Sequence, residues 1–204
     1  MKNQNLKRVF IHEIGHYVAR ELNCELYNLG DGVEQIFIKT HNFSNSIDYL
    51  GGTTARKPKE YVENGEIKNV YEHTAVLLYG CLFQTMYLKS ISNYEFRSCF
   101  NLKENANGKC DAKEFNAMSK HITGPIRKKI VEYTENKYLN MLNADQNHLQ
   151  KIYKLEPSKF LKANDDGYCV HLELLKKELS YFIIKHKKYY SDYIQNIKRI
   201  KNEI

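Results

Sequence analysis

Hydrophobic side chains recur every three or four positions near the start of the chain, over residues 6–23. This spacing places them on one side of an α-helix, so it predicts an amphipathic helix. A second segment, residues 67–88, is apolar nearly all round, which predicts a helix at the centre of the core. The apolar stripe of the first helix comprises Leu6, Val9, Phe10, Ile14, Tyr17, Val18 and Leu22.

Two short segments between these helices predict a small β element. Residues 33–39 read VEQIFIK and residues 49–54 read YLGGTT, and both contain β-branched and aromatic side chains. The turn-forming residues Gly30, Asp31 and Gly32 precede the first segment. We therefore expect a mainly α fold of the α+β class.

Helical patterns continue through the rest of the chain. Asp111 begins a helical segment after a polar loop, and Glu114 is placed to complete a capping box with it. Pro125 opens a further helix. The remaining segments are helical in pattern, with breaks near Pro157 and at residues 164–167, and end in a long helix over about residues 171–199.

The length of 204 residues fits one domain with a substantial core. Hydrophobic residues make up 42% of the chain and charged residues 27%, a balance typical of a folded, helix-rich protein. We expect a single domain over residues 1–204, with a core at about residues 6–122 and a C-terminal helical part at about residues 123–204.

The five cysteines are scattered and include no CxxC pair, which argues against a disulfide framework and against a four-cysteine zinc site. Without a visible signal peptide, this pattern favours a reducing compartment, and the expected location is the cytoplasm. The longest apolar run, residues 74–88, is shorter than the roughly 20 residues that cross a bilayer, so no transmembrane segment is expected. The net charge of +7 decides little, because lysines occur throughout the chain.

The most informative motif is HEIGH at residues 12–16. His12 and His16 lie four residues apart, so on a helix both imidazoles project from one face and can share a metal ion. Glu13 follows the first histidine, where its carboxylate can take a proton from metal-bound water. The motif predicts a Zn²⁺ site with His12 and His16 as ligands and Glu13 as the catalytic base.

A catalytic zinc ion usually has three protein ligands and a water, so another residue must complete the set. Asp111 is the first candidate, although its surroundings fit a helix N-cap equally well. Glu72 and His73, on the second predicted helix, are alternatives. The remaining candidates are His121, Asp48 and Cys110.

An ordered series of segments resembles the peptidase domain of the FtsH family of zinc metalloproteases. The series spans about residues 6–120 and consists of HEIGH, VEQIFI, YLGGTT, AVLLYG and a downstream Gly108 and Asp111 with Ala117. The resemblance implies a zincin-type helical peptidase domain. It also implies that His12, His16 and Asp111 are the zinc ligands and that Glu13 is the base.

Several features depart from the family pattern. The family helix continues into an arginine, two alanines and a glutamate, where this chain has Cys81, Leu82, Phe83 and Gln84. Gly108 also lies one residue closer to the aspartate than usual. The 204 residues contain no P-loop, so we expect activity without an ATPase of the chain's own, and a separate protein partner could deliver substrate. The predicted strand would offer its edge to a polypeptide substrate, through Tyr49, Leu50, Gly51, Gly52 and Thr53.

The leading interpretation is a zinc metalloendopeptidase that cleaves flexible or unfolded polypeptides. One alternative is a catalytically weakened, FtsH-like binding or regulatory protein, motivated by Gln84. Another is a regulatory metallopeptidase of the ImmA/IrrE type, which shares the HExxH motif. Nucleic-acid binding through the basic residues 171–204 is not expected, because the tyrosines among the lysines fit helix packing. The sequence does not define the oligomeric state.

Overall fold

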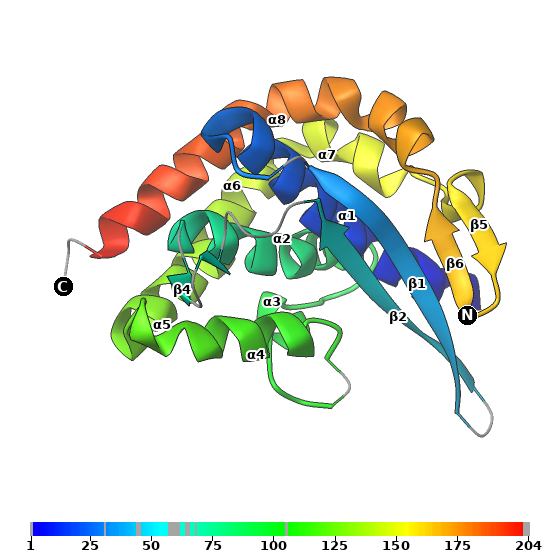
Figure 1. The fold of residues 1–204 in the computed structure, drawn as a ribbon, viewed down its shortest axis with the longest axis horizontal. Coiled ribbons are helices and arrows are strands. Elements are labelled where there is room, and N and C mark those ends of the chain that lie inside the picture. Colours follow the sequence, from blue (N-terminus) through cyan, green and yellow to red (C-terminus); the bar gives the residue numbers. More distant parts are fainter. Residues whose placement is uncertain are drawn as a thin grey trace.

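The computed structural model describes residues 2–30, 32–43, 46–56, 62–63, 66–67, 69–104 and 106–201, so the predicted turn residue Asp31 lies outside the described residues. The fold is mainly helical, with a four-stranded antiparallel sheet and a separate pair of very short strands. Figure 1 shows the long strands β1 and β2 lying alongside helix α1, with α8 above them and α4 and α5 below.

Helices α1 (Lys2–Tyr27) and α2 (Val70–Lys89) form the centre of the molecule and pack against each other. Both predicted helices are confirmed, although α2 begins three residues later than expected. Every residue of α2 from Glu72 to Leu88 is buried, as its all-round apolar pattern indicated.

The backbones of α1 and α2 come unusually close where Gly15 meets Gly80. A Cβ atom on Gly15 would lie 2.2 Å from the carbonyl oxygen of Tyr79 and 2.9 Å from the Cα of Gly80. No side chain fits at such distances, so glycine is required for this crossing.

The sheet has the strand order β2-β1-β6-β5. Strands β1 (Val33–Phe43) and β2 (Ser46–Ala55) pair antiparallel and confirm both predicted strands, each longer than expected. Strand β2 pairs only with β1 among the described residues, so it forms an edge of the sheet, and it packs on α1. The two-residue strands β3 (Val62–Glu63) and β4 (Glu66–Ile67) pair with each other.

A second hairpin comes from the part of the chain that was expected to be helical. Strands β5 (Leu161–Asn164) and β6 (Gly167–Val170) pair with each other, and β6 pairs with β1. The break expected at residues 164–167 is therefore the turn of a hairpin. At Gly167 the φ angle is +146° and a Cβ atom would lie 2.3 Å from the Ile38 carbonyl oxygen, so only glycine fits.

The capping box expected at Asp111 is wrong. Helix α4 (Lys109–Ala117) begins earlier, with Gly108 at its N-cap, so Asp111 lies within the first turn. Glu114 contacts the imidazole of His73 instead of closing a box. The short helix α3 (Phe96–Cys99) precedes this region, and a 3₁₀ turn, Met118–Lys120, follows it.

The C-terminal helices enclose the far side of α1 and α2. Pro125 lies in the first turn of α5, as predicted, and α8 packs on α1, α2 and α5. The elements are α5 (Gly124–Tyr133), a π-helical turn (Thr134–Tyr138), α6 (Leu139–Ala144), α7 (Gln146–Tyr153), a 3₁₀ turn (Pro157–Lys159) and α8 (Leu172–Lys201).

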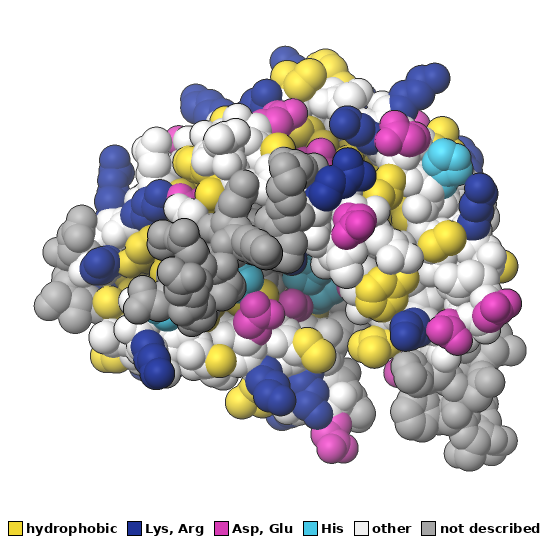
Figure 2. Space-filling view, in the orientation of Figure 1, with side chains coloured by type: hydrophobic (Ala, Val, Ile, Leu, Met, Phe, Trp, Pro, Cys, Tyr) yellow, Lys and Arg dark blue, Asp and Glu magenta, His cyan; other side chains and the backbone are white. Residues whose placement is uncertain are grey.

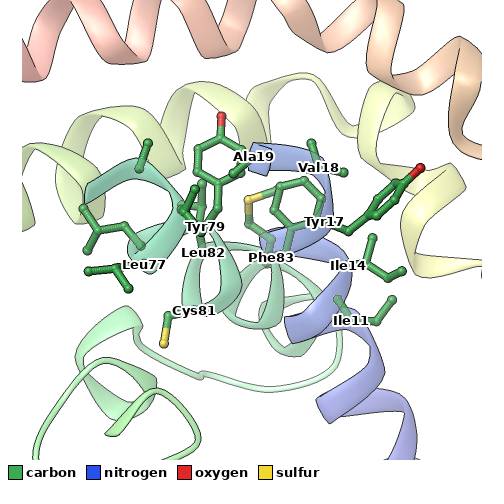
Figure 3. Packing of buried hydrophobic residues seen from close by; sticks show 14 of the residues in the cluster. Ile11, Ile14, Tyr17, Val18, Ala19, Leu77, Tyr79, Cys81, Leu82 and Phe83 are labelled. Carbon is green, nitrogen blue, oxygen red and sulfur yellow. The ribbon is translucent and has the colours of Figure 1, made fainter. Parts of the chain in front are cut away.

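Hydrophobic side chains of α1 and α2 meet in one continuous core (Figure 3). On the far side of α2, the ring of Tyr79 packs against Tyr138, Tyr190 and Tyr193. The Tyr79 hydroxyl lies 2.5 Å from the Tyr138 hydroxyl and 3.2 Å from Nε2 of His186. Polar atoms in this cluster therefore satisfy each other, as buried groups must.

His186 should make the fold sensitive to acid. Burial lowers its pKa to about 3, with a further contribution from the neighbouring His148. An unfolded histidine titrates near its ordinary pKa of about 6.5, so between these values the unfolded state binds a proton that the folded state does not. Stability is therefore present above pH 6.5 and falls as the pH drops toward 3.

We expect the free energy of unfolding from urea titrations to fall by roughly 2 kcal/mol from this group between pH 7 and pH 5. His186→Gln keeps a polar side chain but cannot titrate, so it should flatten this pH dependence. His121→Gln, which removes an exposed histidine, is the matched control for the loss of one histidine from the chain. An unchanged slope in His186→Gln would contradict the assignment.

Candidate metal centre

Helix α1 presents His12 and His16 from one face, four residues apart, as the motif predicted. Both side chains are buried, and their Nε2 atoms lie 3.0 Å from each other. A Cβ atom on Gly80 would lie 2.5 Å from Nε2 of His16 and 2.7 Å from Nε2 of His12. The close helix crossing thus leaves space for both ring nitrogens above the backbone of α2.

Asp111, in the first turn of α4, completes this arrangement. Its Oδ2 atom lies 3.1 Å from Nε2 of His12 and 3.5 Å from Nε2 of His16. One ligand atom from each of the three residues lies within 4.8 Å of the others. Two imidazole nitrogens and one carboxylate oxygen form a donor set that suits catalytic Zn²⁺, with a fourth position left for water. The residues present therefore fit the ion.

The interaction between Asp111 and His12 shifts the pKa of both groups. Burial alone would raise the pKa of Asp111, but the charge of His16 and hydrogen bonds with His12 and His16 hold it below its usual range. Burial alone would lower the pKa of His12, yet hydrogen bonds with Asp111 and Cys99 raise it above its ordinary value. The partly buried carboxylate of Asp111 thus favours positive charge beside it, which a metal cation would supply when the imidazoles are neutral.

The second nitrogen of each imidazole also has a partner. Nδ1 of His16 donates to the carbonyl oxygen of Val76 at 2.8 Å, which leaves Nε2 free to bind a metal. Nδ1 of His12 lies 3.8 Å from the sulfur of Cys99. Both rings are therefore held with Nε2 toward Asp111.

Glu13 lies beside this cluster, against strand β2. The hydroxyl of Thr53 donates to Oε2 of Glu13 at 2.7 Å. A Cβ atom on Gly51 would lie 2.3 Å from Oε1 of Glu13, so the carboxylate lies directly against the strand. Gly52 instead faces the ring of Phe37, where a Cβ atom would lie 2.4 Å from the ring. Gly51 and Thr53 thus fix the carboxylate, a role that the sequence did not indicate.

A cavity of about 470 Å³ opens over these residues. Figure 2 shows histidine atoms in a hollow of this face, with acidic side chains beside them. The residues of the leading site prediction all line the cavity: His12, Glu13, His16, Asp111, Tyr49, Leu50, Gly51, Gly52 and Thr53. Further lining residues that the sequence did not indicate include Arg20, Glu104 and Glu114.

The alternative third ligands lie elsewhere or have other partners. Glu72 is paired with Lys198, and Nε2 of His73 lies 2.7 Å from Oε1 of Glu114. Asp48 and Cys110 line the cavity but belong to no metal-ligand group among the described residues, and His121 is exposed. Asp111 is thus the candidate that the fold places with both histidines.

Gln84, which the sequence analysis singled out, connects two elements next to the site. Its amide donates to the Tyr94 hydroxyl at 3.3 Å and accepts from Asn107 at 3.0 Å. It therefore joins α2 to the segment that leads into α4 and Asp111.

A second group with ligand atoms close together comprises His12, Cys81 and Cys99. Both cysteines are buried free thiols, and Figure 3 shows Cys81 pointing away from the hydrophobic side chains of α1. Burial and its hydrogen bond with Cys99 raise the pKa of Cys81. Burial opposes ionisation of Cys99, but hydrogen bonds with Cys81 and His12 outweigh it and lower its pKa to about 6. Cys81 and Cys99 lie 18 positions apart, a spacing that matches no metal-binding motif in the sequence.

Comparisons with models of protein families, with curated proteins and with solved structures gave no match. In the part of the chain that the structure describes, no helix is both long enough and apolar enough to span a membrane.

We expect the purified protein to bind about one Zn²⁺ per chain. His16→Ala and Asp111→Ala should each weaken binding by at least about 100-fold, because a direct ligand contributes several kcal/mol. His73→Ala removes a buried histidine outside the cluster and is the matched control. Metal analysis and competition with a chromophoric chelator measure both quantities. Unchanged zinc affinity in Asp111→Ala would contradict the ligand set.

Proposed function

We propose that the chain is a zinc-dependent metalloendopeptidase with a zincin-type site that resembles the peptidase domain of the FtsH family. The observation that supports this most strongly is the position of the Glu13 carboxylate. It lines the same cavity as His12, His16 and Asp111 and lies against the sheet-edge strand β2. A base, a metal-ligand set and a strand edge around one cavity are what peptide hydrolysis needs.

His12, His16 and Asp111 would hold the zinc ion, which when bound polarises the scissile carbonyl and makes water more acidic. Glu13 accepts a proton from the attacking water as its oxygen bonds to the carbonyl carbon. The peptide C–N bond then breaks, and Glu13 returns the proton to the leaving amine. The Thr53 hydroxyl, 2.7 Å from Oε2 of Glu13, holds the carboxylate in one orientation during both transfers.

Strand β2 supplies a place for the substrate backbone. Its outer edge has no strand partner among the described residues, and its residues from Tyr49 to Thr53 line the cavity. An extended polypeptide can pair with such an edge, which brings successive peptide groups past Glu13. Folded proteins seldom expose an extended segment, because local opening costs free energy. The proposed substrates are therefore flexible or unfolded polypeptides.

The alternative is a binding or regulatory protein that has lost catalysis. Gln84 motivated it, but its side chain contacts Tyr94 and Asn107 rather than the proposed ligands. A protein that has lost catalysis could keep the same metal ligands and cavity residues. Turnover of a polypeptide substrate is therefore the property that separates a peptidase from a binding protein.

We expect the zinc-loaded protein to cleave casein without ATP and to leave tightly folded proteins intact. Glu13→Gln should lower the cleavage rate by several orders of magnitude at unchanged zinc content, because the amide cannot accept the proton. The amide oxygen can still accept the Thr53 hydrogen bond, so the fold should persist.

His73→Ala is the matched control for this assay, since it alters a buried side chain outside the catalytic cluster. Cleavage products would be followed by gel electrophoresis and mass spectrometry. A Glu13→Gln variant as fast as the wild type would exclude Glu13 as the base. A zinc-loaded wild type that cleaves no casein would favour the binding-protein alternative.

A further inference from the structure

Two thiols from separate elements meet behind the His12 ring. Cys81 lies on α2 and Cys99 ends α3, and both side chains are fully buried. Their sulfur atoms and a ring nitrogen of His12 lie within 4.8 Å of one another. The sulfur of Cys99 is 3.8 Å from Nδ1 of His12, on the side of the ring that faces away from Asp111.

The protonation of imidazole shows which group is the donor in the contact between His12 and Cys99. A neutral imidazole has one N–H, so a ring that binds a metal through Nε2 has its proton on Nδ1. At a buried site this proton needs an acceptor, and the structure places the sulfur of Cys99 there. His16 meets the same need differently, by donating to the Val76 carbonyl oxygen.

We infer that Cys99 is a positioning residue for the metal centre, with its sulfur accepting the Nδ1 proton of His12 so that Nε2 points to the ion. The inference rests on the proposed zinc site and adds a residue to it. Outer partners of this kind fix the tautomer and orientation of a ligating histidine, and their loss typically weakens metal binding by about 10- to 100-fold.

Cys81 and the start of α4 hold the Cys99 sulfur in place. A Cβ atom on Gly108 would lie 2.1 Å from the sulfur of Cys81, so the chain packs directly over this thiol. The backbone N–H of Gly108 donates to the carbonyl oxygen of Cys99 at 3.2 Å. Gly108 is the N-cap of α4, and Asp111 follows three residues later. The thiol pair therefore contacts both the His12 ring and the segment that presents the carboxylate.

The same three atoms form the second group that could hold a metal. An ion there would bind Nδ1 of His12, and simultaneous binding at Nε2 would require the ring to lose both protons. Loss of the second proton of imidazole is unfavourable at neutral pH, so the two sites would compete. The positioning role of Cys99 does not require His12 to lose its second proton. The Nδ1–H donates to the sulfur, and Nε2 keeps its lone pair for the metal.

The test compares Cys99→Ala with Cys99→Ser in the full chain. Alanine and serine have nearly the same volume, so both variants leave a similar space, but only serine offers an acceptor to His12. Zinc affinity would be measured by competition with a chromophoric chelator, and thermal unfolding of the metal-free proteins would report stability. Cys169→Ala, at a thiol outside the cluster, is the control.

We expect Cys99→Ala to bind zinc 10- to 100-fold more weakly than the wild type, Cys99→Ser to recover part of the loss, and Cys169→Ala to be unchanged. In the zinc-loaded wild type, ¹⁵N NMR of the His12 ring should show the proton on Nδ1. Equal zinc affinity in Cys99→Ala and the wild type would overturn the inference. The inference would also be overturned if both variants lost the same amount of zinc affinity and this loss matched their loss of thermal stability. Packing alone would then explain the weaker binding.

Zinc binding that is abolished in Cys99→Ser but unchanged in Asp111→Ala would also overturn it, in favour of a thiol metal site that competes for His12. Each of these results concerns metal affinity and leaves casein cleavage as a separate question. A protein that binds zinc in a Cys99-dependent manner but cleaves nothing would refute the proposed function and support the inference.

Discussion

The contact between Gly15 and Gly80 is the constraint on which the rest of the structure depends. A Cβ atom on Gly15 would lie 2.2 Å from the Tyr79 carbonyl oxygen, so α1 and α2 can approach this closely only without side chains at the crossing. The approach places the Nε2 atoms of His12 and His16 directly over the backbone of α2. Asp111 can then reach both imidazoles from α4.

Side chains on opposite sides of this crossing have different environments. On one side, the imidazoles, Asp111 and Glu13 face a cavity of about 470 Å³. On the other side, Tyr79 projects into a cluster of aromatic rings closed by α8. The aromatic cluster stabilises the fold without a ligand, whereas the polar groups bring three ionisable residues together at a buried point. A cation bound at the proposed site would stabilise the fold, because ion binding to the folded state alone shifts the folding equilibrium toward that state.

The sequence predicted those features that depend on local pattern. The apolar spacing of α1 and the all-round apolar character of α2 defined both helices, and HEIGH placed two imidazoles on one helical face. Strands β5 and β6 were missed because each has only four residues and β5 is mostly exposed, so neither shows a buried and exposed alternation. The pairing of β6 with β1 joins segments more than 120 positions apart, which no local pattern records.

In the site, too, local pattern predicted some features, whereas others depend on how distant segments pack. The residues around Asp111 fitted a cap and a ligand equally well, and the packing of α4 against α2 places its carboxylate beside both histidines. The hydrogen bond from Thr53 to Glu13 joins a strand to a helix 40 positions away. The approach of Cys99 to His12 likewise depends on where α3 packs, and cysteines 18 positions apart form no recognisable metal motif.

X-ray absorption at the zinc K-edge of the zinc-loaded protein tests the central claim most directly, because it identifies the atoms bound to the ion. The account predicts a shell of nitrogen and oxygen atoms at about 2.0–2.2 Å, with the outer scattering of two imidazole rings. A sulfur shell at about 2.3 Å would contradict it, because the ion would then be bound by Cys81 and Cys99 instead of by His16 and Asp111.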